Sequence, residues 1–174
     1  VQEFMGVEAD LVTYGKVIGG GLPVGAFGGK KEIMNHIAPL GQVYQAGTLS
    51  GNPLAVSAGY ATLKVLNENP EIYTNLHNTG ALLKKEIHQI LSQKGVTHSI
   101  NQVGSMISIS FGEKEITSFE DITASSIEKF NEFFHFMLSH GIYLPPSGYE
   151  TWFISDAISS SHIEKTLTAI RKFK

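Results

Sequence analysis

Apolar positions recur along the 174-residue chain with helical and strand periods, and the first third contains four predicted elements. They are strands over residues 10–14 and 23–29, a short helix over 30–37 and a longer helix over 51–69. Asn52 suits the N-cap of the longer helix, and Pro53 suits its first helical position. The spacing predicts one apolar face, made of Leu54, Ala58, Ala61 and Val65. The small residues of this helix predict that it packs tightly: Ala55, Ala58, Gly59 and Ala61.

The stretch Asn-Glu-Asn-Pro over 67–70 is a predicted boundary between two parts of the chain. Beyond it the pattern predicts helices over 71–94 and 122–139, strands over 96–100, 105–111, 142–144 and 151–155, and a last helix that opens with a capping box of Ser161 and Glu164. The expected fold class is α/β, with residues 1–68 forming part of a larger layer and 69–174 forming a small domain.

Composition narrows the possible functions. The net charge of −3 provides no basic field for nucleic acid, and the absence of cysteine excludes disulfides and thiolate metal sites. The seven histidines show no metal-ligand spacing, so no metal site is expected. No apolar run approaches the length of a membrane span, and the first residues do not resemble a signal peptide, so we expect a cytoplasmic protein without membrane partners.

A single lysine, Lys16, precedes three consecutive glycines in the stretch TYGKVIGGGLPVGAFGG. Neither the phosphate-loop pattern nor the dinucleotide-binding pattern fits, because each would need glycine where Val24 stands. A lysine at the end of a rigid element, beside small residues that expose the backbone, suits Schiff-base chemistry. From the residues alone, a solvated lysine beside a loop is the alternative.

The second candidate segment is YQAGTLSGNP, residues 44–53. Gly47 supplies a backbone amide and Thr48 a hydroxyl shortly before a predicted helix start, which is an arrangement that suits an anion. The alternative is an ordinary loop that ends in an N-cap.

These two segments together resemble the class-III aminotransferase group of fold-type I pyridoxal-phosphate (PLP) enzymes. Within that group the combination of GGGLPVGAFGG with VYQAGTLSGNPLA is most similar to the family of glutamate-1-semialdehyde 2,1-aminomutases, and GIYLPPSGYETWFIS resembles a later active-site loop of that family. The resemblance spans nearly the whole chain. It implies that this segment is the C-terminal part of a subunit, comprising part of the large PLP-binding domain and the small C-terminal domain.

The resemblance also implies roles for individual residues. Lys16 corresponds to the lysine that forms the Schiff base with PLP and then moves protons between substrate and cofactor. Thr48 corresponds to the threonine that binds the cofactor phosphate across a subunit interface, with Gly47 adding an amide, which implies a homodimer. The implied reaction is an intramolecular amine transfer, through the PLP and pyridoxamine-phosphate forms, that converts glutamate 1-semialdehyde to 5-aminolevulinate for tetrapyrrole synthesis.

Glu150 is the third candidate, for binding substrate, because the aminomutases resemble this chain in placing a glutamate where related ω-aminotransferases place an arginine. Arg171 is the only arginine of the chain and lies far from this loop in the sequence. A solvated loop glutamate is the alternative; Ser147 and Tyr149 are weaker candidates. A generic PLP-dependent ω-aminotransferase and a non-catalytic relative remain as alternative functions. By resemblance, the aspartate that pairs with the pyridine nitrogen precedes Val1, so we expect the segment alone to be inactive.

Overall fold

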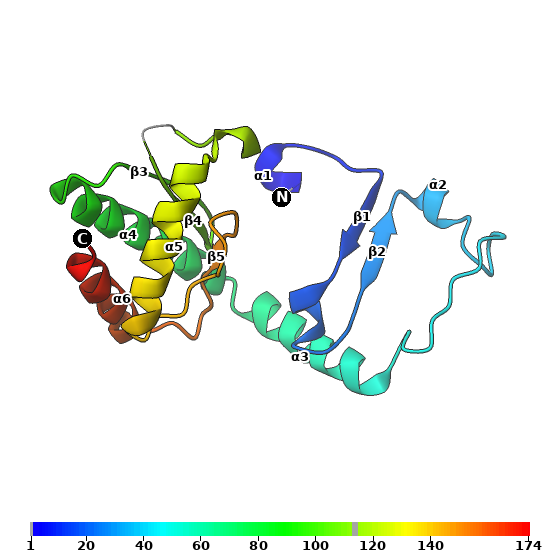
Figure 1. Ribbon diagram of the computed structural model, residues 1–174. Coiled ribbons are helices and arrows are strands. Elements are labelled where there is room, and N and C mark those ends of the chain that lie inside the picture. The colour runs from blue at the N-terminus through cyan, green and yellow to red at the C-terminus, as the bar shows by residue number, and fades with distance from the viewer. Residues whose placement is uncertain (1, 113–114) are drawn as a thin grey trace. The chain divides into compact units, whose positions relative to one another are not determined.

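The computed structural model describes residues 2–112 and 115–174, and the chain divides into two compact units. Unit 1 comprises Val1–Pro70 and unit 2 comprises Glu71–Lys174. Both combine helices with strands, as Figure 1 shows. None of the helices described is long and apolar enough to cross a membrane.

Unit 1 is built on a two-stranded antiparallel ribbon and one long helix (Figure 1). Its elements are α1 (Gln2–Met5), β1 (Leu11–Tyr14), the 3-10 helix η1 (Lys16–Gly19), β2 (Ala26–Gly29), α2 (Lys31–Met34) and α3 (Pro53–Glu68). The two strands pair residue for residue along their whole length, from Leu11 with Gly29 to Tyr14 with Ala26. The predicted strands and helices exist, and the elements over 23–29 and 30–37 are shorter than expected.

Helix α3 begins as the sequence predicts. The Asn52 side chain accepts a hydrogen bond from the Ala55 backbone N–H at 3.1 Å, and Pro53 occupies the first turn. The tight packing predicted for the small residues is confirmed at Ala55 and Gly59, whereas the predicted apolar face is not buried within unit 1. Ala55 and Gly59 are buried, whereas Leu54 and Val65 on the predicted face stay exposed. The small side of the helix, rather than its bulkier side, therefore contacts the rest of the unit.

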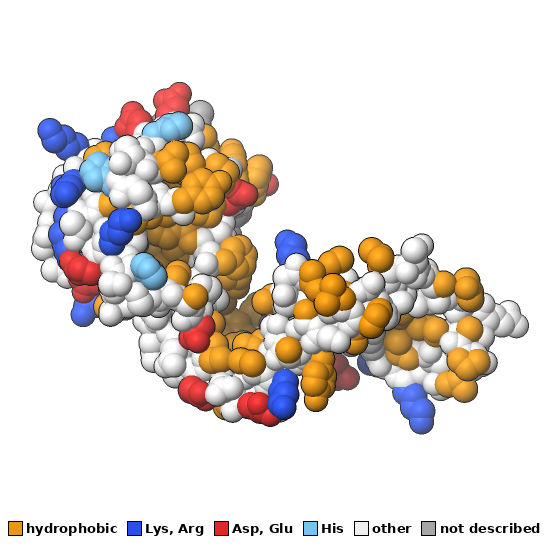
Figure 2. All heavy atoms as spheres, turned by 90° about the horizontal axis from the view of Figure 1, so that it is seen from below, with side chains coloured by type: hydrophobic (Ala, Val, Ile, Leu, Met, Phe, Trp, Pro, Cys, Tyr) orange, Lys and Arg blue, Asp and Glu red, His pale blue; other side chains and the backbone are white. Residues whose placement is uncertain are grey.

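Most large apolar side chains of unit 1 lie on its surface. Among its described residues, only Gly19, Ala55 and Gly59 are fully buried. Figure 2 shows hydrophobic side chains spread over the part of the molecule that contains this unit. On α3 alone, Leu54 is 70% exposed and Tyr60 is 69% exposed. Unit 1 therefore has no extensive hydrophobic core of its own.

Unit 2 packs helices against a three-stranded antiparallel sheet of order β3-β4-β5. Its elements are α4 (Glu71–Gln93), β3 (His98–Val103), β4 (Met106–Phe111), η2 (Phe119–Asp121), α5 (Ala124–Ser139), β5 (Trp152–Phe153) and α6 (Ser160–Lys172). Helix α4 contacts β3 and α6, and α5 contacts β4. Side chains from all these layers meet in one core that includes Ile87, Leu91, Phe130, Phe133, Met137 and Ile170.

Side chains of strand β4 alternate in burial with a period of two residues. Ile107, Ile109 and Phe111 are buried, while Met106 is exposed. Glycine inside α4 has a structural reason, because a Cβ atom at Gly80 would lie 2.7 Å from the Gly104 carbonyl oxygen. The hairpin between β3 and β4 therefore approaches α4 more closely than a residue with a side chain at position 80 would permit.

Three expectations for unit 2 are wrong in detail. Residues 142–144 form no strand, and the strand predicted over 151–155 shortens to β5. The capping box of α6 is formed by Ser159 with His162, not by Ser161 with Glu164, since Ser159 donates its N–H to His162 Nδ1 at 3.1 Å. Three consecutive serines, residues 159–161, stand at the start of this helix, and their spacing alone does not show which one is the N-cap.

Candidate active site

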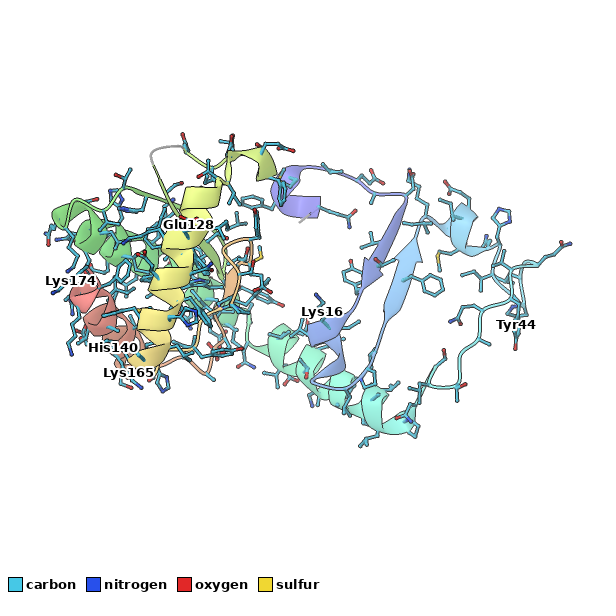
Figure 3. The ribbon with its side chains drawn as sticks, in the orientation of Figure 1. Lys16, Tyr44, Glu128, His140, Lys165 and Lys174 are labelled. Atoms are coloured by element: carbon cyan, nitrogen blue, oxygen red, sulfur yellow. The ribbon has the colours of Figure 1, made fainter. Side chains whose placement is uncertain are left out.

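Lys16 lies where strand β1 ends and η1 begins. Gly15 is extended, and Lys16 then adopts φ 54°, the left-handed region that L-residues other than glycine rarely enter. Such a backbone costs roughly 1–3 kcal/mol, and it is common where function fixes a side chain. The side chain of Lys16 is exposed, and Figure 3 shows it projecting from the start of η1.

The glycines after Lys16 have distinct structural roles. Gly19 is buried against Val24, whose backbone nitrogen would lie 3.2 Å from an added Cβ. Gly20 has φ 59° and ends η1 by donating its N–H to the Val17 carbonyl oxygen at 3.0 Å. Gly21 has φ 91°. The glycine run thus ends a short helix and turns the chain toward β2.

The segment with Gly47 and Thr48 forms a turn that leads to α3. The Ser50 N–H donates to the Gly47 carbonyl oxygen at 2.9 Å, and the Asn52 N–H donates to that of Leu49 at 3.1 Å. Thr48 is exposed, and the Gly47 N–H has no acceptor among residues 2–112 and 115–174. The turn therefore offers a free amide and a hydroxyl near the N-terminus of α3, as an anion site requires.

A cleft of about 710 Å³ lies between this turn and the β1–β2 ribbon. Its lining includes Tyr14, Phe27, Gly47 and Ser50. Lys16 and Thr48 are not among the residues that line it. Figure 3 places Tyr44, which opens this segment, at the far end of the unit from Lys16. The structure therefore places Gly47 in the wall of this cleft, whereas Lys16 and Thr48 lie outside that lining.

Glu150 belongs to unit 2 and closes its own loop. Its carboxylate accepts a hydrogen bond from the Ser147 N–H at 3.1 Å, and its N–H donates to the Ser147 carbonyl oxygen at 3.0 Å. Ser147 Oγ accepts from the Tyr149 N–H at 3.3 Å, and the Tyr149 ring stacks on Phe119. The loop is thus held by its own hydrogen bonds, and the Glu150 side chain remains exposed.

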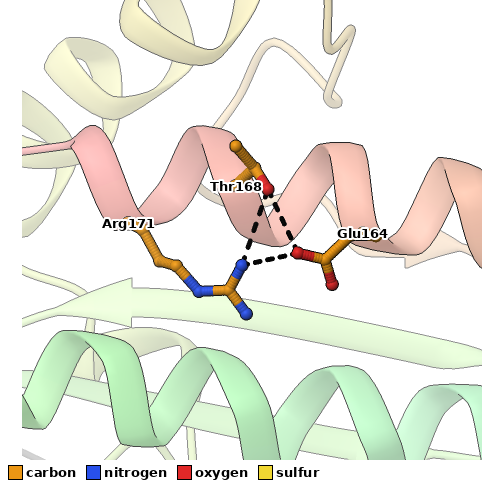
Figure 4. Close-up of polar contacts among 3 residues, drawn as sticks. All are labelled: Glu164, Thr168 and Arg171. Atoms are coloured by element: carbon orange, nitrogen blue, oxygen red, sulfur yellow. Dashed lines mark hydrogen bonds and ion pairs between the residues drawn. The ribbon is translucent and has the colours of Figure 1, made fainter.

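The single arginine is engaged on the surface of α6. Arg171 donates to the Glu164 carboxylate at 2.7 Å, and Thr168 donates to the same oxygen at 3.2 Å (Figure 4). The Arg171 hydrogen bond, then that of Thr168, lower the pKa of Glu164 below its ordinary value. Among the described residues, no three histidine or carboxylate side chains gather as a metal site.

Two features of this site were not apparent from the sequence. One is the left-handed backbone of Lys16, for which the sequence carries no signal because lysine has no preference for it. The other is Tyr14 in the cleft wall, which the sequence presents only as a strand residue. The close approach of η1 to α3 has a weak signal, since Gly59 inside a helix needs a packing reason.

The comparison with known proteins assigns the chain to a family. The class-III aminotransferase family matches residues 1–173. The chain belongs to the class-III aminotransferases. A glutamate-1-semialdehyde 2,1-aminomutase of Flavobacterium johnsoniae is 53% identical over 172 residues, which are 99% of this chain and 40% of that protein. An enzyme of the same name from Thermus thermophilus is 51% identical over 170 residues, 98% of this chain and 40% of that protein.

This class-III aminotransferase chain therefore spans about two fifths of the length of the curated relatives it matches. A crystal structure of a β-phenylalanine aminotransferase from Variovorax paradoxus superposes with a TM-score of 0.88 at 30% identity, over 99% of this chain and 40% of that one. The predicted α/β fold of fold-type I transferases is confirmed.

Proposed function

We propose that this chain is part of a glutamate-1-semialdehyde 2,1-aminomutase, a PLP-dependent isomerase that converts glutamate 1-semialdehyde to 5-aminolevulinate. The observation that carries the proposal is identity of 53% over 99% of the chain to an aminomutase of that name. The activity belongs to a complete subunit, because the chain spans only about two fifths of that relative. A cytoplasmic location and a role in tetrapyrrole synthesis are parts of the proposal.

The residues present fit PLP as the cofactor. Lys16 is an exposed amine on a constrained backbone, and the turn at Gly47 and Thr48 offers an amide and a hydroxyl for a phosphate. When bound, PLP supplies an aldehyde that carries the amine and a ring that takes up negative charge from the substrate carbon. Lys16 would hold the cofactor through its amine. It would also carry the proton between the substrate carbon and the cofactor carbon.

A homodimer is part of the same proposal. Neither Lys16 nor Thr48 lines the cleft at Gly47, and Tyr44 lies at the far end of the unit from Lys16 (Figure 3). In a homodimer, Thr48 of one subunit would bind the phosphate of the cofactor that Lys16 of the other subunit holds. Thr48→Ala is expected to weaken PLP retention in the complete dimer, whereas Ser57→Ala on the exposed side of α3 should leave it unchanged.

Glu150 is proposed to bind substrate. Its carboxylate is exposed and held by the Ser147 N–H, so it is ordered before any ligand arrives. A carboxylate accepts hydrogen bonds from an amino group and repels a second carboxylate. In this place it would favour a diamine-like substrate over the dicarboxylic amino acids that ordinary aminotransferases exchange.

The deciding experiment supplies the complete cofactor-loaded enzyme with glutamate 1-semialdehyde and no other amine or keto acid. Formation of 5-aminolevulinate over many turnovers is expected. Loss of the visible absorbance band of the bound cofactor in Lys16→Ala, but not in Lys31→Ala, would support the role of Lys16. A strict need for a second amino acid or keto acid would refute the aminomutase assignment.

A generic ω-aminotransferase is the second candidate. It is favoured by the close structural likeness to the β-phenylalanine aminotransferase, whose TM-score is 0.88. The same experiment separates the two functions, because an ordinary aminotransferase transfers its amine to a second molecule and stops after one half-reaction without it.

A further inference from the structure

The end of η1 meets α3 through two glycines, Gly59 on α3 and Gly20, the C-cap residue of η1. Gly59 is buried on α3, and a Cβ atom there would lie 2.6 Å from the Ile18 carbonyl oxygen and 3.6 Å from Gly19 Cα. Cβ atoms essentially never approach another atom more closely than 3.0 Å, so any side chain at Gly59 forces the backbones apart. The atom opposite Gly59 is a backbone oxygen, which cannot rotate away as a flexible side chain could.

The contact is reciprocal. A Cβ atom at Gly20 would lie 2.6 Å from the Ala58 carbonyl oxygen and 2.5 Å from Thr62 Oγ1. Thr62 is not free to yield, because its hydroxyl donates to the same Ala58 oxygen at 3.1 Å. Ile18, Gly20, Ala58 and Gly59 therefore form a close backbone contact, which we call the η1–α3 contact.

This contact lies two residues from Lys16. Lys16 is the first residue of η1, and its left-handed backbone has no intrinsic preference to hold it there. The strand before it is short and half or fully exposed, so little on that side restrains it. The position of the lysine is consequently set by where η1 rests on α3.

We infer that Gly59 is a positioning residue for Lys16. The inference rests on the proposed function, since it concerns the lysine that would hold the cofactor. A side chain at Gly59 would push Ile18 away from α3 and displace the Lys16 backbone with it. Reacting groups lose much of their rate when displaced by about 1 Å, so the effect on the lysine would exceed the effect on the fold.

The direction of the change in thermal midpoint in Gly59→Ala distinguishes this inference from an effect of helix propensity. Alanine favours a helix interior more than glycine does, so propensity alone predicts that Gly59→Ala raises the thermal midpoint. The η1–α3 contact predicts the opposite. The matched control is Gly28→Ala in β2, where an added Cβ meets nothing within 4 Å.

The first measurement uses the complete subunit and needs no cofactor. Amide hydrogen exchange at Gly20, whose N–H is bonded to Val17, is expected to accelerate about tenfold or more in Gly59→Ala, as an overpacked contact requires. Gly28→Ala should leave that exchange unchanged. Unaltered exchange at Gly20 in Gly59→Ala would overturn the inference.

The second measurement uses the complete PLP-loaded enzyme, with borohydride reduction to fix the cofactor on its lysine and peptide mapping to locate it. Gly59→Ala is expected to lower the fraction fixed on Lys16, and kcat should fall with little change in KM. Thr62→Ile presses on Gly20 from the same face without changing Gly59. It should show a smaller shift in the same direction, and it keeps the test usable if Gly59→Ala fails to fold.

The outcomes separate the two proposals. If the unsubstituted enzyme fixes no cofactor on Lys16, the proposed function fails and this inference fails with it. If Lys16 is fixed equally in Gly59→Ala, with kcat unchanged, only the inference is overturned.

Discussion

At the scale of single residues, two side chains have properties that their sequence neighbours do not explain. Lys16 has a strained backbone, with φ 54°, although nothing in its own chemistry favours that region. Glu164 has a lowered pKa because the chain's single arginine reaches it across two helical turns. Each property follows from where the fold places the residue.

The strained backbone at Lys16 predicts that a substitution there raises the stability of the protein while it removes the activity. Lys16→Gly removes the left-handed penalty but adds freedom to the unfolded chain, so we expect stabilisation of up to about 1 kcal/mol with complete loss of turnover. Chemical denaturation of the complete subunit measures the first effect and the aminomutase assay measures the second. Lys94→Gly, at an exposed site, is the control. A clear loss of stability in Lys16→Gly would contradict the strain.

The Glu164 carboxylate predicts a direction of pH dependence. Its folded pKa lies below its ordinary value of 4.5, so the stabilisation is present above that value and is lost as pH falls through the lowered pKa. A carboxyl titration by NMR should show the pKa returning toward 4.5 in Arg171→Gln. Thr168→Val should return it by a smaller amount, since its hydrogen bond is the second cause. An identical titration in all three proteins would contradict this account.

At the scale of elements, helix ends and helix faces differ in how far local sequence decides them. The cap of α3 is local: Asn52 bonds Ala55 three residues on, and the sequence predicts it. The face that α3 buries is not local. Its larger apolar residues predict one buried side, but within unit 1 the small residues Ala55 and Gly59 are the buried ones, and η1 approaches α3 backbone to backbone at Gly59.

Removal of the α3 cap tests the local part. Asn52→Ala should cost about 1 kcal/mol of the free energy of unfolding, because the Ala55 N–H loses its acceptor. Asn52→Asp keeps an oxygen at the cap and should cost much less. Asn67→Ala, exposed near the end of the same helix, is the control. Denaturant titration gives the three values, and an equal loss in Asn52→Asp would argue against the cap.

At the scale of the whole molecule, the two units differ in how much of their apolar surface they bury. Unit 2 surrounds Phe133, Ile87 and Met137 completely, whereas unit 1 exposes large residues such as Leu54 and Tyr60. Burial of apolar area is the main source of folding free energy. Unit 2 therefore has the means to fold by itself, and unit 1 is expected to gain stability from further protein surface in a complete subunit.

The core of unit 2 predicts a selective loss of stability. Phe133→Ala should cost about 3–5 kcal/mol, because the ring is fully buried and contacts Phe111 and Trp152. Phe153→Ala, at a ring that is 73% exposed, should change stability by less than about 0.5 kcal/mol. Trp152 is the only tryptophan and lies in this core, so its fluorescence during denaturation reports on unit 2. Equal losses in both variants would contradict the assigned core.

Much of this fold and part of the candidate site were predictable from sequence. The period-two burial of β4, the apolar faces of α4 and α6 and the cap of α3 depend on residues close in the chain. The strand expected over 142–144 is absent because strand pairing depends on distant backbone. The predicted Ser161–Glu164 box is wrong because the helix starts two residues earlier, where Ser159 pairs with His162. Lys16, Gly47 and Thr48 stand out in the sequence by residue type and order, but the sequence does not show that Gly47 lines a cleft whose lining excludes the other two.

The α/β class, the positions of the main helices and the family follow from the amino-acid sequence alone, because they depend on local periodicity and on motifs read in order. The left-handed backbone of Lys16 and the glycine contact between η1 and α3 became visible only in the folded chain. These features arise where distant segments approach within a few ångströms. Close packing, and not local preference, then selects the conformation.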